Sequence, residues 1–434
     1  MVDVAPFKGI TYNKEKISRL DDVMSPPYDI ISKEMQQALY ERHPYNFVRL
    51  ILGKQDPSDS EKNDRYTRAQ KQFSEWIEKQ ILLATDKPSI YPYKIEYTVQ
   101  NQKRTMSGFF ILLRLDPEYK VVKAHERTLS KPKADRLNLM RACKANLEPI
   151  ELLYIDETNE LQQRIDASLG KPLVQVTGYD TFTHTVWKCD DENLIWTVKQ
   201  KLANNILFIA DGHHRYQTAI NYAQEMKEKT QNNDPDAPFN YRMVILSNMF
   251  DEGLAILPTH RLVTLPTIDR KTLRRQLEKY FVVEEEKVSG PSKSYHQRAE
   301  EIKKSIATTD HKFALYFKDV YYILTLKDEH CMDTFAPDRS QIWRTLDVSI
   351  LHKIIIEHLL GVTEDTLEDH VRYTRDDEEA LQFVDEGKYD ASFLLNATKI
   401  HELKAIAEAG EHMPQKSTYF LPKMLSGLVM YTME

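Results

Sequence analysis

The chain has 434 residues, enough for two or three domains with an adequate hydrophobic core. Its composition is that of an ordinary globular protein, with 41% apolar and 29% charged residues, which argues against intrinsic disorder. The formal net charge of −7 argues against a protein that grips a nucleic-acid backbone over a basic face, so we expect no nucleic-acid partner.

The first half of the chain alternates loops, helices and strand pairs. Its first forty residues are rich in loops, because the prolines of Ser25-Pro26-Pro27-Tyr28-Asp29 cannot lie within a helix. Residues 60–84 have the spacing of a long helix, and segments 90–99 and 104–115 alternate as antiparallel neighbours do. A polar stretch, 125–136, opens a helix that runs to about residue 146. Segments 182–188 and 194–198 are typical of a hairpin.

A short apolar run at 205–210 predicts a buried strand. Asp211-Gly212 ends it, and 214–229 follows as a helix. After Pro266 the pattern alternates between helices and strands. The helices are expected near 270–281, 295–307, 346–360, 376–386 and 398–409, and the strands near 312–318, 320–326 and 391–396. The sequence therefore predicts a mixed α/β (α+β) fold, with regions 1–265, 266–340 and 341–434.

The strongest chemical signal is Asp211-Gly212-His213-His214-Arg215, placed between the expected strand and helix. The first turn of a helix has unpaired backbone N–H groups and the positive end of the helix dipole, and both attract anions. Gly212 permits a tight turn and a close approach, and Arg215 with the histidines can hold phosphate oxygens. Asp211 could bind a metal ion or accept a proton.

A simpler interpretation also fits this motif, because Asp is a common helix cap and histidines are often surface residues. The motif is not a P-loop, since no GxxxxGK[ST] pattern occurs in the chain. The absence of HExxH argues against a metalloprotease.

Two further clusters could complete a phosphate site. His125-Glu126-Arg127-Thr128 stands before a helix and could form a phosphate and metal shell, or a solvated loop. Lys416-Ser417-Thr418 resembles the end of a Walker loop but lacks its glycine and strand, and can still bind an anion. The shorter segments His43–Arg49 and Pro258–Arg261 are as easily structural turns as site residues.

The cysteines and the N-terminal sequence indicate the cellular compartment of the protein. Cys143, Cys189 and Cys331 are far apart with no CxxC pair, which argues against a disulfide framework and fits a reducing compartment. The N-terminus lacks a secretory pattern, and no apolar run reaches the ~20 residues that cross a bilayer. We expect a cytoplasmic protein with no membrane partner.

Taken together, the motifs resemble the DUF1015 family over nearly the whole chain. The resemblance rests on these ordered segments: Pro26–Asp29, His43–Arg49, His125–Thr128, Asp211–Tyr216, Pro258–Arg261, Leu346–Ser349 and Met413–Lys423. Asp-Gly-His-His-Arg-Tyr is also similar to a loop of the ParB/sulfiredoxin superfamily, which includes the free serine kinases. The resemblance implies a ParB/sulfiredoxin-like catalytic core with large insertions and a C-terminal α/β region that completes the site.

The same resemblance implies a serine kinase that makes O-phosphoserine from free L-serine in amino-acid metabolism. Its donor would be inorganic pyrophosphate, ATP or ADP, and its cofactor Mg²⁺. Asp29 matches the carboxylate that follows a proline in the free serine kinases, although their residue is Glu. The implied site residues are Asp29, Glu126 and Asp211 (catalytic); Gly212, His213, His214, Arg215, Arg127, Lys416, Ser417 and Thr418 (phosphate or donor); His125, Arg49, His260 and Arg261 (substrate); and Asp211 (metal).

Two other functions remain open from the sequence. A ParB-like, nucleotide-dependent DNA-binding protein would use the same loop, but the acidic charge and the missing basic stripe argue against it. A phosphatase or nuclease would use the loop with water as acceptor. The sequence leaves the donor, the acceptor and the oligomeric state undecided, and sulfiredoxin activity is disfavoured because His213 and His214 stand where a cysteine is needed.

Overall fold

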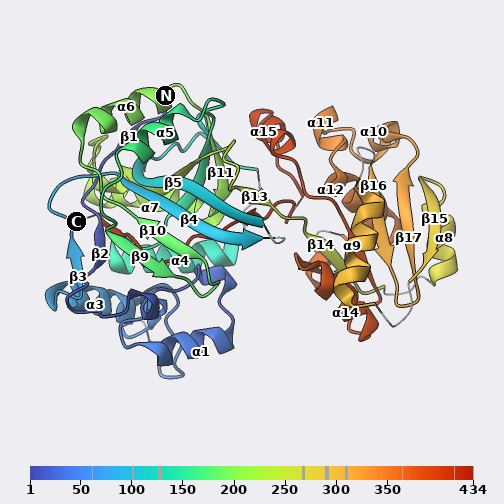
Figure 1. The fold of residues 1–434 in the computed structure, drawn as a ribbon, viewed down its shortest axis with the longest axis horizontal. Helices are drawn as coiled ribbons and strands as arrows, with labels where there is room; N and C mark the ends of the chain where they lie inside the picture. Colours follow the sequence, from blue (N-terminus) through green and yellow to red (C-terminus); the bar gives the residue numbers. More distant parts are fainter. Residues whose placement is uncertain are drawn as a thin grey trace. The chain divides into compact units, whose positions relative to one another are not determined.

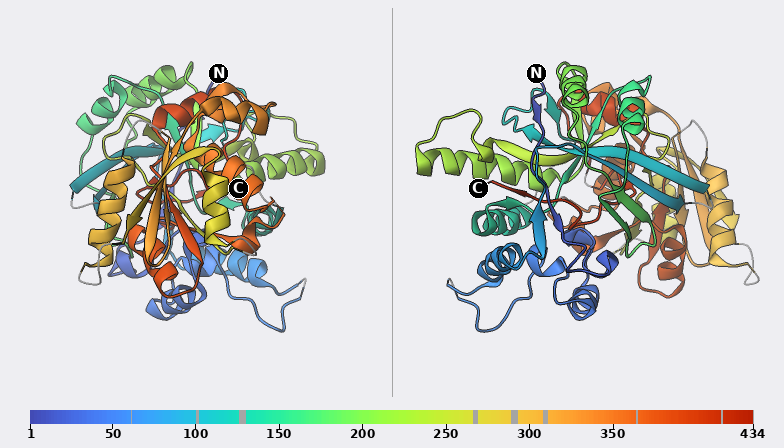
Figure 2. Two further views of the ribbon diagram at one scale, coloured as in Figure 1. Left: turned by 90° about the vertical axis from the view of Figure 1, so that its right-hand side faces the viewer. Right: turned by 60° about the vertical axis from the view of Figure 1, so that its left-hand side comes forward.

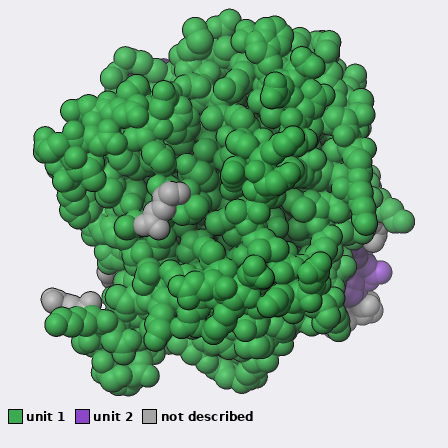
Figure 3. All heavy atoms as spheres, turned by 90° about the vertical axis from the view of Figure 1, so that its left-hand side faces the viewer, with its two compact units in different colours: residues 1–255, 422–434 green, residues 256–421 purple. Residues whose placement is uncertain are grey.

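The computed structural model describes residues 1–60, 62–99, 102–125, 130–265, 269–288, 293–307, 311–363, 365–414 and 416–433. The chain divides into two compact units, coloured separately in Figure 3: unit 1, residues 1–255 and 422–434, and unit 2, residues 256–421. Unit 1 is therefore built from both ends of the chain. The three regions expected from the sequence remain a prediction.

Unit 1 is a mixed sheet with helices packed against it (Figure 1). The elements before residue 100 are β1 (Val4–Ala5), β2 (Ile10–Tyr12), η1 (Leu20–Asp22), η2 (Tyr28–Ile30), α1 (Lys33–Arg42), α2 (Val48–Ile51), α3 (Arg65–Glu78), β3 (Leu82–Ala84) and β4 (Tyr91–Val99). The later ones are β5 (Gln102–Arg114), β6 (Val122–Lys123), α4 (Ser130–Cys143), β7 (Ala145–Asn146), β8 (Ile150–Tyr154), α5 (Glu160–Ala167), β9 (Val174–Thr177), β10 (Thr183–Val186), α6 (Glu192–Leu202), β11 (Leu207–Asp211), α7 (His213–Thr230), η3 (Pro238–Asn240), β12 (Tyr241–Asn248) and β21 (Tyr431–Thr432).

The main sheet of unit 1 has the strand order β6-β11-β8-β12-β5-β4-β10-β9, with β1 paired to β5. Pairs β11–β6 and β12–β8 are parallel, and β11–β8, β12–β5 and β4–β5 are antiparallel. Alternate β5 residues Phe109, Ile111 and Leu113 enter one core cluster, as the two-residue period of a strand requires, together with Tyr216 and Ile220 of α7. Helices α7, α4 and α3 lie side by side in that order (Figure 2, right).

Unit 2 is an antiparallel sheet of order β15-β17-β16-β19-β14-β18 with helices packed against it. Its strands and the short pair at its two chain ends are β13 (Ala255–Ile256), β14 (His260–Val263), β15 (Phe281–Lys287), β16 (Lys312–Tyr316), β17 (Val320–Leu326), β18 (Val371–Thr374), β19 (Ala391–Leu394) and β20 (Phe420–Leu421). Its helical segments are α8 (Arg270–Leu277), α9 (Tyr295–Ile306), η4 (Glu329–Cys331), α10 (Met332–Phe335), α11 (Gln341–Arg344), α12 (Asp347–Ile350), η5 (Leu351–Leu359), α13 (Leu367–His370), α14 (Asp377–Asp385) and α15 (Ile400–Glu408).

Most of the expected elements are confirmed, and two need correction. The segment 194–198 is the middle of helix α6, because Asp191 caps that helix by accepting from the N–H groups of Asn193 and Leu194. The helix expected at 60–84 is shorter: α3 begins after the Asp64 capping box and ends at Glu78. The chain then turns at Gln80, whose φ is 56°, and residues 82–84 form a strand.

The predicted mixed α/β class is confirmed. Among the described residues, no helix is long and apolar enough to span a membrane.

Candidate functional site

The predicted strand, glycine turn and helix are present at residues 207–230. Strand β11 is buried from Leu207 to Ala210, and Gly212 follows with φ 96° and ψ 30°. That left-handed conformation is costly for residues with a Cβ, and a Cβ here would lie 3.0 Å from Nε of Arg215. Helix α7 begins at His213, and its N-cap residue, Gly212, has no side chain that could cap the first turn. The amino end of α7 is therefore a helix terminus of the kind that attracts anions.

Asp211 is held between two cations. Arg215, one turn along α7, and Lys423, from the C-terminal segment, each donate a hydrogen bond to a different oxygen of its carboxylate. Burial alone would raise the pKa of Asp211, but Lys423 and Arg215 outweigh it and hold that pKa well below its usual range. Asp211 is therefore a permanent carboxylate at physiological pH, which makes it a poor base and a suitable partner for cations.

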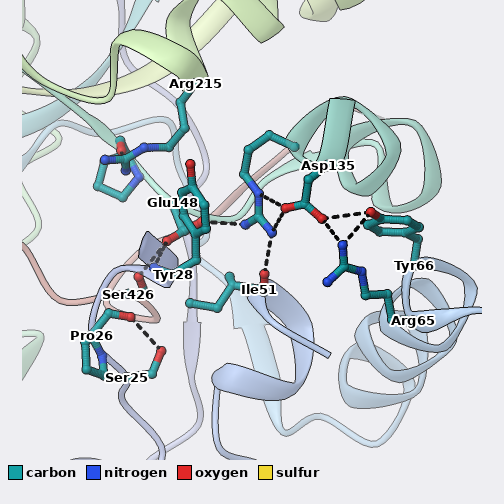
Figure 4. A network of polar contacts seen from close by, with 12 residues as sticks. Ser25, Pro26, Tyr28, Ile51, Arg65, Tyr66, Asp135, Glu148, Arg215 and Ser426 are labelled. Atoms are coloured by element: carbon teal, nitrogen blue, oxygen red, sulfur yellow. Dashed lines mark hydrogen bonds and ion pairs between the residues drawn. The ribbon is translucent and has the colours of Figure 1, made fainter. Parts of the chain in front are cut away.

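Glu148 holds the N-terminal loop of residues 25–29 in place through hydrogen bonds (Figure 4). Its carboxylate accepts hydrogen bonds from the backbone N–H of Tyr28 at 3.2 Å and from the Ser426 hydroxyl at 3.1 Å. It also accepts from Arg136 at 3.2 Å, whose guanidinium lies 3.9 Å from the centre of the Tyr28 ring. The loop that carries Asp29 is thereby fixed by a buried carboxylate.

A second buried carboxylate, Glu151, lies beside Asp211. The two residues are register partners on strands β8 and β11. Glu151 is 2% exposed, and neither of its oxygens has a hydrogen-bond partner among the residues that the structure describes. Burial raises its pKa to about 8, although Lys423 lowers it. Glu151 is therefore largely protonated at neutral pH.

Two buried arginines, Arg136 and Arg242, contact Glu148. Arg242 is buried and donates to the Glu148 carbonyl at 2.6 Å, and burial lowers its pKa to about 9, with Arg215 acting in the same direction. Arg136, Glu148, Arg215 and Arg242 line a cavity of about 20 Å³. That volume holds about one water molecule, so it is too small for a phosphate group.

Two histidines meet at the start of α7. The rings of His125 and His213 lie 4.6 Å apart between centroids at 85°, and the backbone N–H of His125 donates to Nε2 of His213 at 3.4 Å. Both residues are buried, whereas His214 is half-buried. The pair therefore joins the segment before α4 to the first turn of α7.

The other expected residues of unit 1 have different environments. Asp29 is exposed on η2, close enough for its charge to act on Arg215. Arg49, on α2, donates to the Tyr40 carbonyl at 2.7 Å and stacks on the Tyr40 ring, away from the contacts around Asp211. Glu126 and Arg127 lie outside the described residues.

The expected site residues of unit 2 form a cluster of their own. His260 lies on β14 with Nε2 2.7 Å from the Asp377 carboxylate, while its Nδ1 accepts from the Leu395 N–H. Arg261 is fully buried and donates to the backbone carbonyls of Thr259 and Lys416. Burial lowers its pKa to about 10.

The segment 416–418 contacts the same cluster, because the Lys416 carbonyl accepts a hydrogen bond from Arg261. Ser417 is buried, and its hydroxyl donates to the Pro414 carbonyl at 2.6 Å, while the Lys416 side chain is exposed and Thr418 is half-buried. The expected convergence of Lys416 with Asp211 on one cleft remains a prediction, as does the substrate role of His260 and Arg261.

Sequence reasoning missed Lys423, Glu148 and Glu151, whereas Arg136 belongs to the polar stretch 125–136 already singled out. Glu151 carried a signal, because Pro149-Ile150-Glu151-Leu152-Leu153 places a carboxylate within an apolar strand, which is costly unless the carboxylate has a function. Lys423 carried none, since it comes next to Asp211 only through the fold.

Three of the solved structures that are similar to this chain follow. A conserved hypothetical protein from Pyrococcus furiosus is 15% identical with a TM-score of 0.34, over 72% of this chain and 90% of that one. A free serine kinase in complex with AMP is 14% identical with a TM-score of 0.35, over 72% and 87%. A C-terminally truncated SbnI from Staphylococcus aureus is 10% identical with a TM-score of 0.32, over 73% and 85%. No curated protein matches the chain.

A comparison with protein families gives a firmer result. The model described as "Protein of unknown function (DUF1015)" matches residues 4–349, which is more than half of the chain. The match includes β11, Gly212 and the start of α7, as well as the loop that carries Asp29. The chain belongs to the DUF1015 family.

Proposed function

We propose that this protein is a phosphotransferase that transfers a phosphoryl group to the hydroxyl of free L-serine, with pyrophosphate or a nucleotide as donor. The observation that carries the proposal is the amino end of α7. Its N-cap residue is a glycine in the left-handed conformation, which has no side chain to cap the helix, and Lys423 and Arg215 lie beside it. Phosphoryl transfer depends mainly on positioning and on neutralising the phosphate oxygens, and this end of the helix offers both.

In this proposal the donor phosphate binds the backbone N–H groups of the first turn of α7. Lys423 and Arg215 supply positive charge, and Asp211 fixes the position of both cations through its two oxygens. Because Arg215 is buried and cannot lose its proton, its charge persists throughout the reaction. The pair thus offers a preorganised electrostatic environment for the charge on the transferred group.

Asp29 is the proposed base. The serine hydroxyl gives its proton to this carboxylate while its oxygen bonds to the transferred phosphorus, and the bond from that phosphorus to the leaving phosphate oxygen breaks. Asp29 is exposed, and the bond from the Tyr28 N–H to Glu148 fixes its loop. Glu126 is the second candidate base, from the sequence alone.

Mg²⁺ is the proposed cofactor, and it would neutralise the negative charge of the donor's phosphate oxygens. In the described part of the chain, no three His, Cys, Asp or Glu side chains gather as a metal site. Both oxygens of Asp211 already accept hydrogen bonds, but each has a further lone pair. We therefore propose that Mg²⁺ arrives with the donor, held chiefly by phosphate oxygens and water, with Asp211 as its protein ligand.

The test is ³¹P NMR of the purified protein with L-serine, Mg²⁺ and, in turn, pyrophosphate, ATP and ADP. A phosphoserine resonance that requires protein, serine and one donor is the expected result. Orthophosphate without phosphoserine would indicate a phosphatase instead. No reaction with any donor would contradict the proposal.

The same assay separates the two candidate bases. Asp29→Asn keeps the shape of the side chain but removes its basicity, so turnover should fall while donor binding survives. Glu15→Gln, an exposed carboxylate change in the same region, is the matched control and should behave as wild type. If Asp29→Asn and Glu126→Gln both keep near-normal rates, neither residue is the base.

A further inference from the structure

Unit 1 has a second polar cavity, separate from the residues around Asp211. It has a volume of about 340 Å³ and lies against α1, α2 and α3 and the loop that joins α2 to α3. Four cations line it: Arg49, Lys54, Arg65 and Arg68. Its volume is at the lower end of the ~300–1,000 Å³ range of small-molecule pockets, so it is large enough for a compact ligand.

The cations exceed the carboxylates around this cavity. Arg68 is neutralised by Asp59, through contacts of 2.5 and 3.2 Å, and Asp56 is a further carboxylate of the lining. Arg49 and Lys54 have no carboxylate partner in the described part of the chain. The cavity therefore keeps a positive excess near these two side chains.

Arg65 has a carboxylate partner. It donates to Asp135, whose other oxygen accepts from Arg136 (Figure 4), and Arg136 in turn also pairs with Glu148. The positive excess of the lining therefore lies on Arg49 and Lys54. All four cations of the lining are half-buried, where the attraction of an anion is screened less than on an open surface.

The guanidinium of Arg49 keeps unused hydrogen-bonding capacity. Its Nε is buried and has no partner among the described residues, while another nitrogen of the same group donates to the Tyr40 carbonyl. The neighbours of Arg49 therefore do not fully satisfy it.

The lining also restricts the kind of ligand. Arg49 and Lys54 lie 4.3 and 4.6 Å from the centre of the Tyr40 ring, so the aromatic ring is already stacked with cations and is poorly placed to stack a nucleobase. The remaining lining is polar, including Gln55, Ser58 and Asn63. We propose that this cavity binds a compact polyanion of the phosphate or pyrophosphate class. The inference does not rest on the proposed function, because it uses none of the residues around Asp211.

The test is isothermal titration of the full chain with inorganic phosphate and with pyrophosphate, without Mg²⁺ and at constant ionic strength. In the double variant Arg49→Gln/Lys54→Gln, the dissociation constant for the anion that binds in the cavity should rise by about tenfold or more. Each of the two cations contributes a charge-assisted hydrogen bond to that anion. Lys71→Gln removes an exposed cation of α3 outside the lining and should bind as wild type. Identical titrations of wild type and the double variant would overturn the proposal.

Titrations of two further variants test whether the anion binds in the cavity or at α7. Gln55→Glu adds a negative charge to an exposed side chain of the lining without changing its shape, so the variant should fold as wild type does. Its affinity for phosphate should fall, because the added charge repels the anion. Unchanged affinity in this variant would also overturn the proposal. Lys423→Gln, in contrast, should leave the titration of the cavity intact; if it alone abolishes all anion binding, the cavity is not a site. If Lys423→Gln changes nothing while the double variant loses binding, the anion that binds without Mg²⁺ occupies the cavity, which supports the proposal.

Discussion

Lys423 and Asp211 form an ion pair although 212 residues separate them in the sequence. The contact brings the C-terminal segment of unit 1 to the junction of β11 and α7. Two cations from different parts of the chain thereby meet on one carboxylate, beside a helix end whose N-cap residue is a glycine.

Replacing Lys423 by Met should destabilise the protein and weaken donor binding. The side chains of Lys423 and Asp211 are 11% and 19% exposed, and the loss of one partner of such a buried pair costs about 3 kcal/mol. Without Lys423, the pKa of Asp211 should also rise toward its usual range. Urea unfolding measures the first effect, and the exposed Lys199→Met is the control, with a change near zero. Equal stability of the two variants would show that the ion pair contributes nothing.

Gly212→Ala should cost about 1–2 kcal/mol of stability, because Gly212 has φ 96° and that conformation is unfavourable for residues with a Cβ. The added methyl would also press on Arg215 and displace it from the anion site. Gly170→Ala is a matched control: its Cβ would meet nothing within 4 Å, and its stability should be unchanged or slightly higher. A Gly212→Ala variant with wild-type stability and donor affinity would contradict the role given to this turn.

Glu148→Gln should lower turnover more than donor affinity. The substitution removes the charge that holds Arg136 and weakens the acceptor for the Tyr28 N–H, so the loop that presents Asp29 loosens. Steady-state kinetics with serine as the varied substrate should show the loss mainly in kcat. Glu75→Gln, which breaks only an exposed pair with Lys79, should have little effect. If the variant loses donor affinity while kcat is unchanged, the prediction is wrong, and Glu148 contributes to donor binding and not to positioning Asp29.

The stability of unit 2 should fall as the pH rises through the pKa of His311. Nδ1 of His311 lies 2.7 Å from the Asp347 carboxylate, and this hydrogen bond raises the pKa of His311 above its ordinary value of 6.5. A pKa that is higher in the folded state adds stability that is complete below 6.5 and is lost as the pH rises past the raised value.

Urea unfolding from pH 5 to 9, followed by hydrogen exchange in unit 2, measures this effect. His311→Gln should flatten the profile, whereas His296→Gln, which removes an exposed ring facing Glu378, should keep it. If the His311→Gln profile has the same slope as that of wild type, the ion pair does not contribute to the pH dependence.

Local patterns predicted the fold around the site well. The apolar run before Asp211 and the helical pattern after Gly212 are contiguous in sequence, so their strand, turn and helix could be inferred directly. Segment 194–198 misled because its β-branched residues favour a strand, while the Asp191 cap that starts the helix was overlooked.

The surroundings of the site could not be inferred in the same way. Glu148, Arg136 and Lys423 contribute through tertiary contacts, and no local pattern encodes which distant segments will pack together. Arg49, whose motif resembles the family, lines the cation-lined cavity, and its expected role in substrate binding stays a prediction.

The central claim is that the amino end of α7 binds the phosphate donor, and a crystal structure with pyrophosphate and Mg²⁺ tests it most directly. The account predicts a phosphate group within hydrogen-bond distance of the backbone N–H groups that open α7 and of Nζ of Lys423. Well-ordered pyrophosphate bound elsewhere, with the first turn of α7 contacting no part of it, would contradict the account.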